Sequence, residues 1–81
     1  MFKYEVTKLG ENHFSIRVPD GIILTSYESV IALWGNDDCI YLFKDWDFSK
    51  NTTKYLCRWL GVKSVKGIRK GIEEGKYNVQ L

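Results

Sequence analysis

The sequence has few of the residues that build metal sites and disulfide scaffolds. Its 81 residues include two cysteines, Cys39 and Cys57, and a single histidine, His13. A structural zinc site needs four ligands at suitable spacing, and a small disulfide scaffold usually carries four or more cysteines. Both cysteines also lie among large apolar residues. We therefore expect two buried, reduced thiols, no metal site and no cofactor.

Long apolar runs are missing as well. No segment approaches the roughly 18 apolar residues that a membrane-spanning helix needs, and residues 1–10 contain no apolar region typical of a signal peptide. At the same time, 44% of the residues are apolar and 15% are aromatic, which is more bulky apolar content than a disordered chain has. We expect a single folded domain over residues 1–81, located in the cytoplasm and away from membranes.

The first half of the chain has the pattern of β-strands. Apolar or β-branched segments alternate with turn-forming sequences such as Pro19-Asp20-Gly21. The segments are 2–9, 14–18, 22–27, 29–34 and 39–43. The two middle segments form either two strands broken near Glu28 or one long bulged strand. Because the links are too short for parallel crossovers, the pattern predicts four or five antiparallel strands.

Towards the C-terminus the apolar period changes to that of helices. Ser49 or Asn51 can cap a first helix through Leu60, and Ser64 can cap a second one. Residues 77–81 alternate again, like a short strand. The expected fold class is α+β, with an antiparallel sheet of four to six strands and two short helices near the C-terminus, in the order β-β-β-β(-β)-α-α-β.

The positive charge is concentrated in a segment without acidic residues. Residues 48–72 contain seven basic residues and no acid, whereas the rest of the chain contains five basic and ten acidic residues. In the expected helices the basic residues recur every three or four positions, so they share the side opposite the apolar stripe. The seven are Lys50, Lys54, Arg58, Lys63, Lys66, Arg69 and Lys70. This face can bind phosphates, meet an acidic protein, or simply be solvated.

Two features precede or open the first helix. Trp46 lies between two aspartates, a composition frequent at binding hot spots. We expect it to be a partly exposed contact, although it could instead fold back over the sheet edge. Ser49, Thr52 and Thr53 stand where free N–H groups and the helix dipole favour an anion. They form a candidate phosphate site, but helix capping explains the same residues without a ligand and is the preferred interpretation.

The side chains do not assemble a catalytic set. Nucleophilic catalysis needs a nucleophile, an activating base and an orienting group, and no serine or cysteine has a sequence relation to His13. The aspartates at 37, 38, 45 and 47 are explained as turn formers or as partners of nearby cations. We expect no catalytic residues. An enzyme would require His13 and several acids to converge on a cleft.

Residues 44–60 resemble a motif of small bacteriophage proteins of unknown function. In those proteins an aromatic-Ser-x-x-Thr-Thr stretch opens a helix that ends in a hydrophobic-Leu/Phe-Gly sequence, here Phe48 to Thr53 and Trp59-Leu60-Gly61. A Ser-Tyr pair before an apolar strand, here Ser26-Tyr27, also recurs in them. The likeness spans about residues 22–61 and carries no known chemistry. It implies a phage or prophage origin, and small phage proteins commonly act by occupying a host machine.

The leading hypothesis is a non-catalytic, phage-type binding module. Its basic two-helix face, with Trp46, would contact nucleic acid or a host nucleoprotein complex. The alternative is a protein-only inhibitor of a host defence system or host enzyme, anti-CRISPR-like, that docks through the sheet edge and exposed aromatic residues. An acidic host protein is a further partner to test. A homodimer is also compatible with the sequence, because exposed sheet edges can pair across a two-fold axis.

Overall fold

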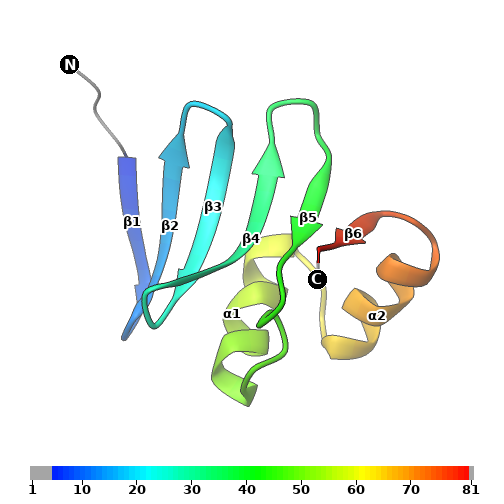
Figure 1. Ribbon diagram of the computed structural model, residues 1–81. Helices are drawn as coiled ribbons and strands as arrows, with labels where there is room; N and C mark the ends of the chain where they lie inside the picture. Colours follow the sequence, from blue (N-terminus) through cyan, green and yellow to red (C-terminus); the bar gives the residue numbers. More distant parts are fainter. Residues whose placement is uncertain (1–4, 81) are drawn as a thin grey trace.

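Five strands, two helices and a last strand follow one another along the chain (Figure 1). The computed structural model describes residues 5–80, so positions 2–4 and 81 of the expected terminal strands lie outside the described residues. The elements are β1 (Glu5–Gly10), β2 (His13–Val18), β3 (Gly21–Ser26), β4 (Ser29–Gly35), β5 (Ile40–Leu42), α1 (Lys50–Leu60), α2 (Val65–Glu73) and β6 (Tyr77–Val79). The α+β class and the element order are confirmed.

The six strands form one sheet in the sequential order β1-β2-β3-β4-β5-β6. Strands β1 to β5 are antiparallel neighbours. Strand β6 runs parallel to β5, so the expectation of a wholly antiparallel sheet is wrong for this pair. The physical reason is the length of the connection: both helices lie between β5 and β6, and such a crossover can bring the chain back to the end where β5 starts.

The turn between β3 and β4 shows that residues 22–34 form two strands. Ser26 pairs with Ser29 across a two-residue turn. Its central residues, Tyr27 and Glu28, have φ angles of 50° and 71°, the left-handed values that a type I′ hairpin turn requires at both positions. For residues with a Cβ atom this conformation costs roughly 1–2 kcal/mol each. The hairpin therefore holds a strained and exposed turn at one end of the sheet.

A bulge in β4 adds an extra residue to the core. Leu24 pairs with Ala32 but Thr25 pairs with Val30, which leaves Ile31 unpaired between them. A bulge interrupts the strict alternation of side chains between the two faces. As a result Ile31 and Ala32 are both buried, at 1% and 0% exposure.

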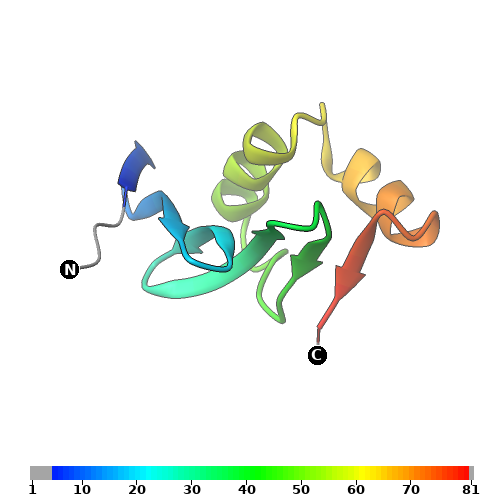
Figure 2. The ribbon, with the colours of Figure 1, turned by 90° about the horizontal axis from the view of Figure 1, so that it is seen from above.

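Both helices lie on the same side of the sheet (Figure 2). Helix α1 packs against β3, and α2 packs against β6. The buried core between the helices and the sheet consists of Leu24, Ile31, Ala32, Ile40, Leu42, Trp46, Leu56, Cys57, Ile68 and Tyr77. Within residues 5–80 no helix is long and apolar enough to cross a membrane.

A glycine in the last turn of α2 permits its close packing on β6. A Cβ atom at Gly71 would overlap with the ring of Tyr77, which is buried at the start of β6. Glycine inside a helix costs about 1 kcal/mol relative to alanine. The close contact between helix and aromatic ring gives a physical reason for keeping glycine there.

Candidate functional site

A groove of about 440 Å³ lies between α1 and the start of α2. Four of the seven basic residues of the acid-free segment line it, and no acidic residue does. We call these four residues, Lys50, Lys54, Arg58 and Lys63, the basic groove. Its remaining lining is apolar or hydroxylic: Thr53, Cys57, Val62, Ser64 and Val65. The lining of the groove therefore combines four positive side chains with neutral ones.

Helix α1 presents three of these cations on one side. Lys50, Lys54 and Arg58 are four residues apart and exposed, whereas Leu56, on the opposite side, is fully buried. The helix ends at Gly61, whose φ is 78° and whose N–H bonds to carbonyls of the last turn. This tight turn starts the link to α2 and brings Lys63 to the same groove.

The ring of Tyr55 connects the basic side of α1 to the sheet. Lys54 Nζ and the guanidinium carbon of Arg58 lie 5.9 Å and 5.8 Å from the centroid of this ring, within the range of cation–π attraction. The ring also lies 4.2 Å from that of His13 in β2. In the described part of the chain neither cation forms an ion pair with a carboxylate. Both charges thus remain available to an anionic ligand.

The three basic residues of α2 are divided between solvent and the protein itself. Lys66 and Lys70 are exposed, but neither lines the groove. Arg69 lies 3.6 Å from the carboxylate of Asp47 and 5.2 Å from the ring of Trp46. Arg69, which was expected to be a free binding cation, is therefore already paired with Asp47.

The prediction that Trp46 is a partly exposed contact is wrong. Trp46 is 6% exposed and belongs to the buried core. Two hydrogen bonds fold its loop: the Trp46 N–H donates to the Phe43 carbonyl and the Phe48 N–H donates to that of Asp45. The indole lies inside while Phe48 is 72% exposed. Phe48, which the sequence analysis did not single out, is therefore the exposed aromatic side chain of this loop.

The start of α1 is capped from within the protein. Ser49 Oγ accepts a hydrogen bond from the Thr52 N–H at 3.1 Å, and the Thr53 hydroxyl donates to the carbonyls of Ser49 and Lys50. Thr52 is 0% exposed and Thr53 is 9% exposed. Because these hydroxyls are occupied and mostly buried, they do not form an open anion site. Capping, the preferred interpretation, is confirmed.

Thr52 also belongs to a buried chain of hydrogen bonds between α1 and the sheet. His13 Nδ1 lies 2.6 Å from the Glu11 carbonyl, which can only accept. With a neutral imidazole, Nε2 then accepts from the Ser26 hydroxyl at 3.0 Å, and Ser26 accepts from Thr52 at 3.0 Å. Ser49 in turn donates to Thr52 at 3.0 Å. Each proton in this series of hydrogen bonds has an acceptor, so these buried polar groups are all hydrogen-bonded.

Part of this chain follows from the β2–β3 hairpin. The two-residue turn at Pro19-Asp20 pairs Val18 with Gly21, and the same register pairs His13 with Ser26. Because turn length fixes hairpin register, the sequence alone contains this pairing. The contact of Ser26 with Thr52 depends on how α1 docks on the sheet and has no local sequence signal.

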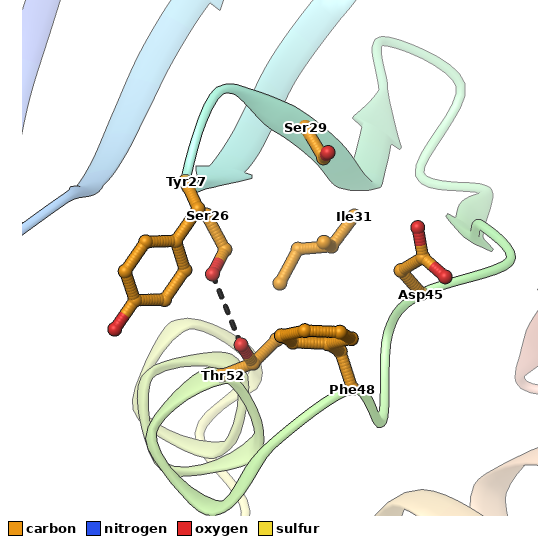
Figure 3. Close-up of a pocket in the computed structure, with 7 residues that line it drawn as sticks. All are labelled: Ser26, Tyr27, Ser29, Ile31, Asp45, Phe48 and Thr52. Carbon is orange, nitrogen blue, oxygen red and sulfur yellow. Dashed lines mark hydrogen bonds between the residues drawn. The ribbon is translucent and has the colours of Figure 1, made fainter.

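A second, smaller pocket opens beside this chain (Figure 3). It has a volume of about 180 Å³. We call it the aromatic pocket, and its lining consists of Ser26, Tyr27, Ser29, Ile31, Asp45, Phe48 and Thr52. Phe48 and Tyr27 are 72% and 49% exposed. In Figure 3 the Phe48 ring lies across from Ile31, and the linked hydroxyls of Ser26 and Thr52 stand beside them.

Ser26 and His13 have the spacing of a nucleophile and its base. Both are nevertheless buried, at 4% and 1% exposure, and Ser26 is held by Thr52 as well as by His13. The orienting group of His13 is a backbone carbonyl rather than a carboxylate. Asp45 lines the same pocket but makes no hydrogen bond to this pair. The hydrogen bond between Ser26 and Thr52 links α1 to the sheet beside the pocket.

The two thiols differ in their surroundings. Cys57 is 7% exposed and lines the groove, and burial raises the pKa of its thiol. Cys39 is only partly buried, so the expectation of two buried thiols is wrong for Cys39. The Cys39 N–H donates to the Asp37 carboxylate and lowers its pKa, while interaction with Asp37 raises the pKa of Cys39. Among residues 5–80 no three His, Cys, Asp or Glu side chains are grouped to hold a metal ion.

Comparisons of the chain with protein-family models, curated proteins and solved structures found no match. The resemblance of residues 22–61 to phage proteins therefore stays a prediction. The functional proposal below rests on the geometry and charge of the basic groove.

Proposed function

We propose that the protein is a non-catalytic binding module that contacts nucleic acid, alone or within a host nucleoprotein complex, through the basic groove. One observation supports this function most directly. Four cations line a groove of about 440 Å³ that contains no acidic residue. A face that is merely solvated needs no such concavity, and a net charge of +2 for the chain does not require the cations to gather in one place.

The chemistry of the groove suits phosphate better than bases. The cations of the groove, Lys50, Lys54, Arg58 and Lys63, have long, flexible side chains that can reach phosphate oxygens, and contacts to phosphates carry no sequence information. Each neutralised phosphate releases counterions, so four contacts predict a slope of log K against log salt of about −3.6 for duplex DNA and about −2.8 for single strands. Lys66 and Lys70 can extend the contact along α2. We therefore expect binding with little sequence preference and strong salt dependence.

The test is fluorescence anisotropy with labelled random-sequence DNA and RNA, in single- and double-stranded form, between about 50 and 300 mM salt. The variant Lys54→Glu with Arg58→Glu removes two contacts in the middle of the groove. It should weaken binding at least about tenfold and reduce the salt slope by about two contacts. The matched control is Lys44→Glu with Lys76→Glu, which changes the net charge equally at two exposed positions outside the groove.

Three outcomes would contradict the proposal. One is the absence of binding at the lowest salt. The second is binding that the groove variant leaves unchanged. The third is equal weakening by groove variant and control, because net charge rather than the groove would then explain the affinity.

The aromatic pocket favours a second candidate function, that of a protein-only inhibitor of a host enzyme or defence complex. Exposed aromatic residues around a pocket are typical of binding hot spots, and here Phe48 and Tyr27 flank one. Tyr27 is also held in the strained left-handed conformation, and such strain clusters at functional sites. The Tyr27 N–H donates to the Asn12 carbonyl, which fixes the turn.

Affinity capture with variants separates the two functions. A partner captured from nuclease-treated lysate that is lost with Phe48→Ser, but retained with Lys54→Glu and Arg58→Glu, would support the inhibitor. The reverse pattern, with loss on nuclease treatment and no effect of Phe48→Ser, would support the basic groove. Phe48→Ser should not disturb the fold, because most of the Phe48 side chain is already in solvent.

A further inference from the structure

The side of the sheet that faces away from the helices carries a continuous row of apolar side chains. Cross-strand pairs share one face of a sheet, so the register identifies the members. Ser15, which bonds to Trp59 of α1, and its partner Leu24 lie on the covered face. Their neighbours along the strands therefore lie on the other one.

The members of this face run across five strands. Val6 pairs with Ile16, Ile16 with Ile23, Ile23 with Leu33, and Leu33 with Tyr41. Phe14 lies two residues from Ile16 on the same face. We call these six residues, Val6, Phe14, Ile16, Ile23, Leu33 and Tyr41, the open face.

The core of the domain does not account for the open face. None of its six residues belongs to the buried core or packs against it. Val6 is 57% exposed, and the other five are only partly buried. The neighbouring residue Lys8, which pairs with Phe14, is the one charged side chain on this face among the described strand residues. When one face of an antiparallel sheet meets water, that face usually carries polar residues. Here six residues of that face are apolar or aromatic.

We infer that the open face is an interaction surface for a second copy of this chain, with two sheets packed face to face. Two apolar sheet faces can pack on each other, about 10 Å apart and with their strands within about 30° of each other. The five strands together contain 28 residues, and at about 3.3 Å per residue and about 4.8 Å between strands they cover about 440 Å² per copy. Two copies bury about 900 Å², which is the size of a weak, reversible interface.

The charge distribution favours this occupant over an anionic partner. The open face offers only Lys8 to a carboxylate or phosphate. The basic groove is lined by residues of α1 and the start of α2, and both helices lie on the other side of the sheet. Pairing through the open faces therefore keeps the two basic segments apart. If the proposed function holds, the dimer would carry two grooves on its outer sides. The pairing itself does not depend on nucleic acid and is measured without it.

The test is sedimentation equilibrium of the full chain without nucleic acid, from about 1 µM to about 1 mM, with two variants of adjacent residues in β1. Val6→Asp places a charge on the open face, and Thr7→Asp places the same charge on the covered side at a position that is also exposed. We expect a reversible dimer with a Kd of about 10 µM or more, in keeping with its small area. Val6→Asp should raise this Kd at least tenfold, and Thr7→Asp should leave it within about twofold.

A second measurement needs no substitution. In methyl NMR spectra recorded on dilution, the methyl groups of Ile16, Ile23 and Leu33 should shift, and those of Ile68 and Leu56 in the helix-side core should not. A monomer at about 1 mM would overturn the inference. So would a dimer that Val6→Asp leaves intact, or one that both variants weaken equally. A dimer whose dilution shifts map to the helices would equally overturn it.

Discussion

The two faces of the sheet carry similar apolar residues that have different roles. On the covered face Leu24, Ile31 and Leu42 are at most 1% exposed beneath the helices, and buried hydroxyls tie α1 to the strands. On the open face Ile16, Ile23 and Leu33 carry equally apolar side chains without a layer above them. The same residue type thus stabilises the monomer on one face and, as we infer, a dimer on the other. Composition alone does not distinguish these roles, because only the register assigns a residue to its face.

The sharpest test of this difference uses two adjacent residues of β3. Leu24 is fully buried, whereas its neighbour Ile23 lies on the open face. Leu24→Ala should lower the free energy of unfolding by about 3 kcal/mol, because it removes buried methyl groups and leaves a cavity. Ile23→Ala should cost about 1 kcal/mol, mainly through lost strand propensity. Urea denaturation at about 1 µM protein, where dimers are dissociated, checks both values. Equal costs would mean that the open face is covered in the monomer.

Much of this fold could be predicted from the sequence because its signals are local. Turn-forming residues such as Pro19-Asp20-Gly21 and the cap at Ser49 fix where elements begin and end, and the structure has them there. The direction of β6 could not be predicted, since it depends on how the helices return the chain to the sheet. The bulge at Ile31 could not be predicted either, because β-branched residues fit either face of a strand.

The candidate site was predictable in part for the same reason. Lys50, Lys54 and Arg58 share a helix side by spacing alone, and the structure places them together in the groove. The fates of Trp46 and Arg69 depend on a loop that folds back onto α2. Tryptophan beside charges is compatible with exposure or with burial under a cation, and here Arg69 covers it. The burial of Trp46 and the pairing of Arg69 therefore depend on tertiary packing and not on local composition.

The hydrogen-bond chain of the covered face gives the next largest effect. Thr52→Val keeps the shape of the side chain but removes the hydroxyl between Ser26 and Ser49. Leaving these buried groups short of a partner should cost about 1–2 kcal/mol. Thr25→Val is the matched control. Thr25 is only partly buried and its hydroxyl makes one long contact of 3.4 Å, so the change should stay within about 0.5 kcal/mol. A reversed order in thermal or urea unfolding would show that the chain contributes little.

The smallest effect concerns the two thiols, one of which is partly exposed and the other buried. Cys39 is partly exposed just before β5, whereas Cys57 is 7% exposed and lines the groove. Iodoacetamide should therefore label Cys39 in the native protein at least about tenfold faster than Cys57, because access to the sulfur is needed as well as the thiolate. The pKa of each thiol is raised, so little thiolate exists at neutral pH and both rates should climb as the pH rises beyond 9.

For Cys57 the same shift favours the folded state below the ordinary thiol pKa, and this contribution is lost as the pH rises towards the raised value. Peptide mass spectrometry over a pH series, with Cys39→Ser as control, measures the two rates. Faster labelling of Cys57 would mean that α1 and α2 separate readily, and a groove that opens so easily would hold its cations less rigidly than the proposed function requires.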